Sequence, residues 1–272
     1  MLNIGACKRP DRRAMDRPEA NNGISRLKRW PIYRMARFLY RFSTDAEYRS
    51  VALIRFEKPP GLFQPFIDTL PDRYPFLFAF AREKLGADTQ ARVLSFGCST
   101  GEEVFALRRY LPMATIKGID INRRNIAICN ARCRSSPDPA IVFEVGGSTR
   151  TEEIGSYDAI FCLAVLRHGD LSAFGGDRCD HMIRFADFER VVGDFSRCLR
   201  PGGLLFIAHS NFRFGDTAAA SGFEVVFRVP TPEPDPRTPI FDRNNRLMHG
   251  AAYGEMVFRK LPHYAQQAAH DA

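Results

Sequence analysis

A run of small residues interrupts an apolar stretch early in the chain, and its residue types suit the binding of a nucleoside. The sequence RVLSFGCSTGEEVF spans residues 92–105, and three small residues separate Gly97 from Gly101. Glycines permit a tight turn, and the amides at the start of the following helix bind polar or anionic groups. The next apolar run, TIKGID, ends at Asp120, where a carboxylate can accept hydrogen bonds from ribose hydroxyls. Strand, glycine turn, helix, strand and acid together predict a nucleoside-binding half.

The glycine spacing excludes two other classes of nucleotide site. Cys98, Ser99 and Thr100 stand between the two glycines, so the GxGxxG spacing of dinucleotide-binding turns is missing. The chain also has no GxxxxGKS or GxxxxGKT sequence, which excludes a P-loop.

Apolar runs of strand length alternate with helical segments from residue 91 onwards, and this pattern predicts an α/β fold. We expect a mostly parallel sheet with helices on both faces. Two later apolar runs are expected to close the sheet, and the Pro-rich stretch between them, residues 230–252, is expected to be a long loop. The expected strands are 92–96, 115–119, 141–145, 157–163, 204–209, 223–229 and 254–261, and the expected helices are 101–111, 122–134 and 185–199.

Composition predicts a basic N-terminal extension ahead of this fold. Residues 1–23 have few large apolar groups and read as a disordered basic arm, and residues 24–89 as a mostly helical, aromatic cap region. The α/β domain would occupy residues 90–262, and residues 263–272 would form a tail.

The charge of the chain is concentrated in that extension. Residues 1–43 contain eleven Lys or Arg and three Asp or Glu, an excess of +8 that equals the whole-chain net charge. Such a segment suits an anionic membrane, nucleic acid or an acidic partner, or is simply a solvated arm. Because no RNA-binding signature accompanies it, we predict no specific nucleic-acid partner.

Cysteine usage and hydropathy favour a cytoplasmic protein. The 272 residues include seven Cys, an odd number without a CxxC pair, which fits reduced thiols better than a disulfide framework. We find no transmembrane stretch of about 20 apolar residues and no apolar signal core at the N-terminus. No metal site is predicted.

The glycine turn and its surroundings resemble class I S-adenosylmethionine-dependent methyltransferases. SFGCSTG is similar to the first motif of that family, GIDIN to the second, and LRPGGLLFIAHS to the segment entering the fifth strand. The resemblance covers roughly residues 90–212. It implies a Rossmann-like fold with a seven-stranded sheet and S-adenosylmethionine as the cofactor.

Within that family the closest motif likeness is to the chemotaxis-receptor glutamate methyltransferases. GCSTGEE, YDAIFC and LLFIAHSNF resemble their segments, but the active-site arginine motif and the receptor-docking β-subdomain of those enzymes are absent, and Ala164 stands where they carry Asn. LAVLRHGDL also resembles the quinone-biosynthesis O-methyltransferases. The resemblance implies that Glu102 faces the cofactor ammonium and Asp120 its ribose. The cofactor-binding residues expected are Gly97, Cys98, Ser99, Gly101, Glu102, Asp120, Ile121, Ala164 and Val165.

His168 is the candidate for proton transfer. It follows the fourth expected strand, at the carboxyl edge where open α/β sheets bind ligands, and its ordinary pKa suits a general base near neutrality. Asp170 could orient it, while a structural histidine is the alternative. His209 ends the fifth expected strand, with Asn211 beside it, and could line the substrate side, covered by residues 56–80 or 230–252.

Two functional hypotheses follow. The first is a methyltransferase that acts on a small molecule or on a protein carboxylate. The second is a non-catalytic module on the same fold, which Ser95 favours because many family members have an acid at that position.

Overall fold

A computed structural model describes most of the chain as two compact units that divide after Arg49. The predicted basic arm, residues 1–23, and the predicted tail, residues 263–272, lie outside the described part. The described residues are 31–67, 69–70 and 72–262.

The described part of the smaller unit is helical. Helix α2 (Pro31–Thr44) has no buried residue, and helix α3 (Ala46–Glu57) begins just before the division. Asp45 starts α3, because its Oδ1 accepts a hydrogen bond of 2.9 Å from the backbone N–H of Tyr48. These helices agree with the expected helical character of the N-terminal region.

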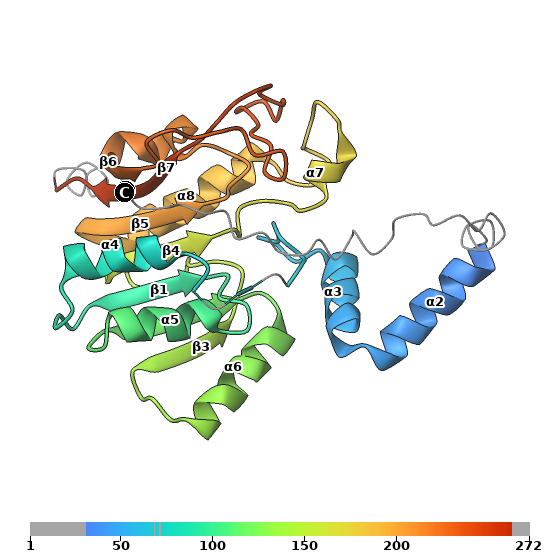
Figure 1. Cartoon of the computed structure of the whole chain (residues 1–272), viewed down its shortest axis with the longest axis horizontal. Helices are drawn as coiled ribbons and strands as arrows, with labels where there is room; N and C mark the ends of the chain where they lie inside the picture. The colour runs from blue at the N-terminus through green and yellow to red at the C-terminus, as the bar shows by residue number, and fades with distance from the viewer. Residues whose placement is uncertain (1–30, 68, 71, 263–272) are drawn as a thin grey trace. The chain divides into compact units, whose positions relative to one another are not determined.

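The larger unit is built on one seven-stranded sheet in the order β3-β2-β1-β4-β5-β7-β6 (Figure 1). The first five strands are parallel, and β7 pairs antiparallel with both of its neighbours. The sheet is therefore mostly parallel, as predicted. The strands are β1 (Arg92–Phe96), β2 (Thr115–Asp120), β3 (Ile141–Val145), β4 (Tyr157–Leu163), β5 (Leu199–Ala208), β6 (Phe223–Arg228) and β7 (Glu255–Lys260).

Helices cover both faces, because successive side chains of a strand point to opposite sides. In β1, Val93 packs with buried residues of α4, α5 and α6, whereas Leu94 packs with those of α8. Both valine and leucine are fully buried, which requires a hydrophobic layer on each face. The helices are α4 (Pro75–Leu85), α5 (Glu102–Tyr110), α6 (Arg123–Ser135), the short α7 (Leu171–Phe174) and α8 (Phe185–Cys198).

Helix α4 is part of the larger unit. Its Leu77, Phe78 and Ala81 are buried against the sheet, so the structure divides well before residue 89, where the sequence placed the end of the cap region. The bounds of the predicted domains stay a prediction.

The fifth strand differs from the expected one at both ends. It begins at Leu199, which pairs with Tyr157, and the Pro-Gly-Gly turn forms an irregularity before regular pairing resumes at Leu204. It ends at Ala208, because His209 has a left-handed φ of 51° that breaks the extended backbone.

The stretch between β6 and β7 contains no helix or regular strand in the described chain, in agreement with the predicted loop at 230–252. Two isolated bridges, Arg178 with Arg246 and Phe241 with Leu247, are its only β pairings there. Among the described residues, no helix has the length and hydropathy needed to cross a membrane.

Candidate active site

The turn after β1 has the unusual backbone that its glycines predict. Gly97, Ser99 and Gly101 have φ values of 75°, 52° and 92°. Only glycine adopts this region without strain, so the conformation of Ser99 is costly and must be held by its surroundings. A Cβ on Gly97 would lie 2.3 Å from Cγ2 of Val165, which shows how closely the turn approaches the segment after β4.

Asp120 holds Ser99 in place. One carboxylate oxygen, Oδ2, accepts a hydrogen bond of 2.8 Å from the Ser99 backbone N–H, and Oδ1 accepts one of 2.8 Å from the Asn122 N–H and one of 3.2 Å from Asn125 Nδ2. Burial raises the pKa of Asp120, and these hydrogen bonds oppose that shift. The structure thus brings together the glycine turn and the acid that the sequence predicted as partners.

A polar atom in this turn is left without a partner. Ser99 Oγ is buried and has no hydrogen-bond partner within the described part of the protein. Buried hydroxyls are normally satisfied, so an orphan hydroxyl beside Asp120 fits a site that receives a polar ligand.

The backbone amides of the turn are less available than the sequence indicates. Gly97 and Cys98 N–H both donate to Ile119 O, Ser99 N–H donates to Asp120, and Gly101 N–H donates to Cys98 O. These amides therefore hold the turn together, and a ligand carboxylate needs donors from elsewhere.

The two glutamates at the start of α5 have different environments. Glu102 accepts hydrogen bonds from Thr100 Oγ1 at 2.6 Å and from Arg132 Nη1 at 3.0 Å. Glu103 instead turns toward β1, and its Oε1 accepts a hydrogen bond of 2.7 Å from Ser95 Oγ. Burial of its carboxyl raises the pKa of Glu103 to about 7, although Ser95 and Arg73 oppose the shift.

Glu103 is thus a candidate that the sequence reading missed. Ser95 occupies the strand position where many methyltransferases that the sequence resembles carry an acid, and Glu103 brings a carboxyl to that serine from the neighbouring helix. The sequence signal that could have found Glu103 was the serine at position 95. Because that strand position lacks an acid, a carboxylate from a nearby element could take its place.

The other predicted cofactor residues line the same edge of the sheet. Ala164, just after β4, has a left-handed φ of 60°, and its N–H donates to Ala208 O at 2.8 Å. Ile121 follows β2 and lies against Gly147, where a Cβ would be 2.9 Å from Ile121 Cδ1. Cys98 is buried, and its interaction with Cys129, followed by burial, raises the pKa of its thiol, so it is no nucleophile at neutral pH.

His168 lies at the same edge, and Asp170 meets it through its backbone N–H. Its Nδ1 accepts a hydrogen bond of 3.3 Å from the backbone N–H of Asp170, whose carboxylate forms an ion pair with Arg55 at 3.1 Å. Burial lowers the pKa of His168, so the ring is neutral near pH 7, and with Nδ1 as acceptor its proton lies on Nε2.

At the end of β5, His209 pairs with Tyr74. The Tyr74 hydroxyl and His209 Nδ1 are 2.9 Å apart. Burial and the nearby Arg73 and Arg167 lower the pKa of His209 to about 4, while burial raises that of Tyr74 to about 12. Both groups are therefore neutral at physiological pH.

Asn211, the other predicted residue after β5, is a fully buried structural link. Its Oδ1 accepts the His168 N–H at 2.8 Å, and its Nδ2 donates to Pro239 O at 2.7 Å. The side chain joins the segment after β4 to the long loop.

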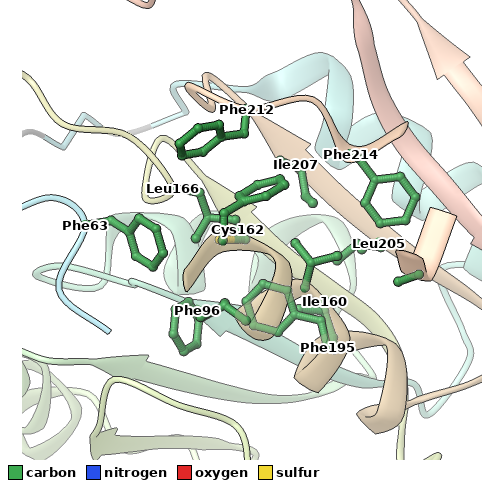
Figure 2. Close-up of a cluster of buried hydrophobic side chains, with 14 of the residues drawn as sticks. Phe63, Phe96, Ile160, Cys162, Leu166, Phe195, Leu205, Ile207, Phe212 and Phe214 are labelled. Atoms are coloured by element: carbon green, nitrogen blue, oxygen red, sulfur yellow. The ribbon is translucent and has the colours of Figure 1, made fainter. Parts of the chain in front are cut away.

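The segment before α4 runs along the carboxyl ends of the strands. At β3, a Cβ on Gly147 would be 2.9 Å from Pro60 O. Next along the segment, Phe63 is buried in the core cluster that also holds Phe96 and Leu166 (Figure 2). Gln64 Oε1 accepts the Gly169 N–H at 3.3 Å. Residues 58–66 therefore span the ends of β3, β1 and β4.

The 230–252 loop contacts the same edge from the side of β5. Arg237 O accepts a hydrogen bond of 2.6 Å from Arg167 Nη2, and the Phe241 N–H donates to Asn211 O at 2.8 Å. Both segments that the sequence proposed as covers thus touch residues at the strand ends. Within the described chain, no group of His, Cys, Asp and Glu side chains could hold a metal ion.

The sequence profile of a family described as "Methyltransferase domain" matches residues 87–232, more than half of the chain. This chain belongs to the class I methyltransferase domain family. The cofactor of that family is S-adenosylmethionine, in agreement with the turn, the acid and the sheet order described above.

Curated relatives of this methyltransferase domain include enzymes named for small-molecule acceptors. It is 25% identical over 160 residues to a ubiquinone biosynthesis O-methyltransferase of Rhizobium rhizogenes, covering 56% of this chain and 57% of the relative. It is 29% identical over 168 residues to a trans-aconitate 2-methyltransferase of Deinococcus radiodurans, covering 57% and 56%. The chain thus spans about half the length of these relatives.

Among solved structures, a Haemonchus contortus phosphoethanolamine N-methyltransferase 2 bound to S-adenosyl-L-methionine is similar to this domain. The match has a TM-score of 0.40 and 16% identity, and it covers 61% of this chain and 34% of the other.

Proposed function

We propose that this domain transfers a methyl group from S-adenosylmethionine to a small-molecule acceptor. The observation that carries the proposal is the link between Asp120 and Ser99. It fixes a left-handed turn beside a buried carboxylate and leaves the Ser99 hydroxyl without a partner.

The chain's residues fit the parts of that cofactor. Asp120 is the proposed acceptor for the ribose hydroxyls, and Ile121 the apolar contact for the adenine. The small residues Gly97, Cys98 and Gly101 let the backbone of the turn approach a ligand closely. Ala164 and Val165 border the turn on the side of β4. This assignment is supported by the shared strand edge on which all these residues lie.

Two carboxylates compete for the ammonium group of the methionine part. Glu102 is the one implied by family resemblance, but its oxygens already bind Arg132 and Thr100. The Glu103 carboxyl is buried, and its described hydrogen bond comes from the Ser95 hydroxyl. We assign the ammonium to Glu102 as first candidate and to Glu103 as second.

Paired variants separate the two candidates. Glu102→Gln and Glu103→Gln each keep the size of the side chain and remove its charge. The variant that weakens binding of S-adenosylhomocysteine, the demethylated cofactor, identifies the ammonium contact. Equal affinity of both variants and the unchanged protein would exclude both glutamates.

When bound, the cofactor supplies an already activated methyl group, so the protein's tasks are alignment and proton removal. His168 is the proposed proton acceptor, because it is neutral and lies at the end of β4. It must give up the 3.3 Å contact from the Asp170 N–H at Nδ1, or exchange tautomers, to accept a proton.

A small acceptor is favoured over a protein side chain by the two segments at the strand ends. Residues 58–66 and the 230–252 loop both contact this edge, so an acceptor has to reach it past these two segments. The names of the curated relatives also refer to small molecules. A protein carboxylate, which the chemotaxis-like motifs indicate, is the alternative acceptor.

The experiment uses S-adenosylmethionine with a labelled methyl group and cell extract divided by size. We expect label in the small-molecule fraction with this chain and much less with Asp120→Ala at the same cofactor concentration. Base-labile label in protein would support the carboxylate alternative. A chain that binds S-adenosylhomocysteine but labels neither fraction would support the non-catalytic module.

A further inference from the structure

A cationic side chain at the end of β4 lacks a partner for one of its buried donors. Arg167 donates through Nη2 to Arg237 O at 2.6 Å, but its Nε is buried and has no hydrogen-bond partner among the described residues. A buried guanidinium donor without an acceptor is costly, so the arrangement calls for an acceptor that binds there.

The neighbours of Arg167 are donors as well. The Tyr74 hydroxyl and His209 Nδ1 share one proton, so whichever group donates, the neutral pair keeps one further O–H or N–H for another partner. Arg73 lies over the Tyr74 ring, with its guanidinium carbon 5.4 Å from the ring centroid. The charges of Arg73, Arg167 and Arg237 all disfavour a proton on His209.

Two carboxylates of the described chain act against this positive charge, and both have hydrogen-bond partners. Glu103 acts on Tyr74, and its carboxyl accepts a hydrogen bond from Ser95. Asp235 acts on Arg167, but its own carboxylate is hydrogen-bonded to Arg237 and Thr238. Burial and then Arg73 lower the pKa of Arg167, whereas Tyr74 and Asp235 oppose that shift, so the protein offsets this positive charge only in part. An anion would compensate it.

The strand order places this cluster to one side of the glycine turn and Asp120. Asp120 ends β2 and the glycine turn ends β1, whereas Arg167 follows β4 and His209 follows β5. Neighbouring strands are about 4.8 Å apart, so β5 lies roughly 10 Å from β1. A group bound at Arg167 and His209 therefore lies on the acceptor side.

We propose that the methyl acceptor carries a carboxylate group, which Arg167 and the Tyr74–His209 pair bind; this proposal rests on the proposed function. An arginine fork and a neutral hydroxyl or imidazole donor match the oxygens of a carboxylate. Arg167 then selects acidic acceptors and holds them at the end of β4, next to His168.

The test is calorimetric titration of whole protein saturated with S-adenosylhomocysteine. The probes are acetate, benzoate and 4-hydroxybenzoate, with acetamide, benzamide and 4-hydroxybenzamide as neutral counterparts. At least one carboxylate should bind and its amide should not. Arg167→Gln should weaken carboxylate binding by about 10-fold or more and leave the affinity for S-adenosylhomocysteine unchanged. Arg167→Lys should have a smaller effect.

The matched control is Arg237→Gln, which removes a neighbouring exposed charge but keeps the backbone oxygen that Arg167 binds. If both variants weaken carboxylate binding equally, the effect comes from the net positive charge of the region, and the proposed carboxylate site at Arg167 is wrong. Loss of S-adenosylhomocysteine affinity in Arg167→Gln would assign the arginine to the cofactor. If S-adenosylhomocysteine binds but no carboxylate does, this inference fails alone; if S-adenosylhomocysteine does not bind, the proposed function fails.

A different observation concerns α2 and stands independently of the active site. Its apolar side chains are exposed, among them Ile32, Met35 and Leu39, at 76%, 60% and 57%. These positions recur at helical spacing, while Arg34, Arg37 and Arg41 occupy the opposite side of the helix.

We infer that α2 lies on an anionic lipid surface, with its apolar side in the headgroup boundary. The pairing of an apolar side with arginines is the chemistry that anionic lipids recognise, and the many basic residues before α2 add to the attraction.

Co-sedimentation of the whole chain with vesicles tests this inference. Binding is expected to vesicles containing phosphatidylserine and to be weak with phosphatidylcholine alone. Met35→Glu/Leu39→Glu should abolish binding, whereas Phe56→Glu, at an exposed apolar position on α3, should not. Unchanged binding of the double variant, or no binding by the unchanged chain, would overturn the inference.

Discussion

Asp120 Oδ2 accepts a hydrogen bond of 2.8 Å from the backbone N–H of Ser99, which joins the end of β2 to the turn after β1. The contact spans 21 positions in the chain and holds Ser99 in a left-handed conformation. The same carboxylate is thus a structural clamp on the turn and the proposed ribose ligand. Its removal should affect both roles.

Asp120→Ala should weaken binding of S-adenosylhomocysteine by about 1–3 kcal/mol, because charged hydrogen bonds are lost and the Ser99 N–H is stranded. Calorimetry measures the affinity, and circular dichroism checks that the variant is folded. Unchanged affinity in a folded variant would remove Asp120 from the ribose site.

Gly97→Ala should destabilise the protein by about 1–3 kcal/mol, because the new Cβ meets Val165 and the residue has a φ of 75°. Gly97→Ala/Val165→Ala should recover part of the loss by removing the contact while the backbone strain remains. Chemical denaturation gives these values. A single variant as stable as the unchanged protein would show that the turn is not tightly packed against the segment after β4.

Glu103 should make stability depend on pH. Burial raises its pKa from 4.5 to about 7, so the folded protein holds this proton in a window where the unfolded chain has released it. The free energy of unfolding therefore falls as pH rises from about 4.5 to 7, by about 3 kcal/mol from this group. Glu103→Gln should remove that fall in urea denaturation series.

His209 provides the opposite slope and an internal control. Its pKa is lowered from 6.5 to about 4, so the unfolded chain takes up this proton first as the solution becomes acidic. Stability from this group is lost as pH falls from about 6.5 to 4. His209→Gln should remove that loss, and identical pH profiles for both variants would contradict the two environments described here.

His168→Gln should retain the affinity for S-adenosylhomocysteine and lower turnover by about 100-fold or more, the scale expected for a general base. His181→Gln, at a more exposed histidine, is the comparison. Full turnover of His168→Gln would leave His168 as a structural residue that caps the segment after β4.

The sheet was predictable because its strands are short apolar runs bounded by turn residues, and β1, β3 and β4 have the expected bounds. The start of β5 was not predictable from the sequence. Leu199 joins the strand because it pairs with Tyr157 of β4, ahead of the Pro-Gly-Gly turn, and a local pattern does not reveal that pairing. The strand–turn–strand pattern supplied the positions of the glycine turn and Asp120, and the structure shows that they meet at Ser99.

The side-chain contacts that distinguish this site could not be predicted from the sequence. Glu102 and Glu103 are adjacent, and only the rotation of α5, set by burial of Val104 and Leu107, decides which one meets Ser95. Tyr74 and His209 are 135 positions apart, so no local sequence pattern predicts their contact. Asp170 meets His168 through its backbone N–H, while its carboxylate pairs with Arg55, which lies 115 positions away in the chain.

Titration of S-adenosylhomocysteine into the whole chain, followed by calorimetry, tests the central claim most directly. Saturable binding to one site, weakened by Asp120→Ala, is the predicted result. A folded chain that does not bind S-adenosylhomocysteine, or one whose affinity is the same without the Asp120 carboxylate, would contradict the assignment of this strand edge to the cofactor.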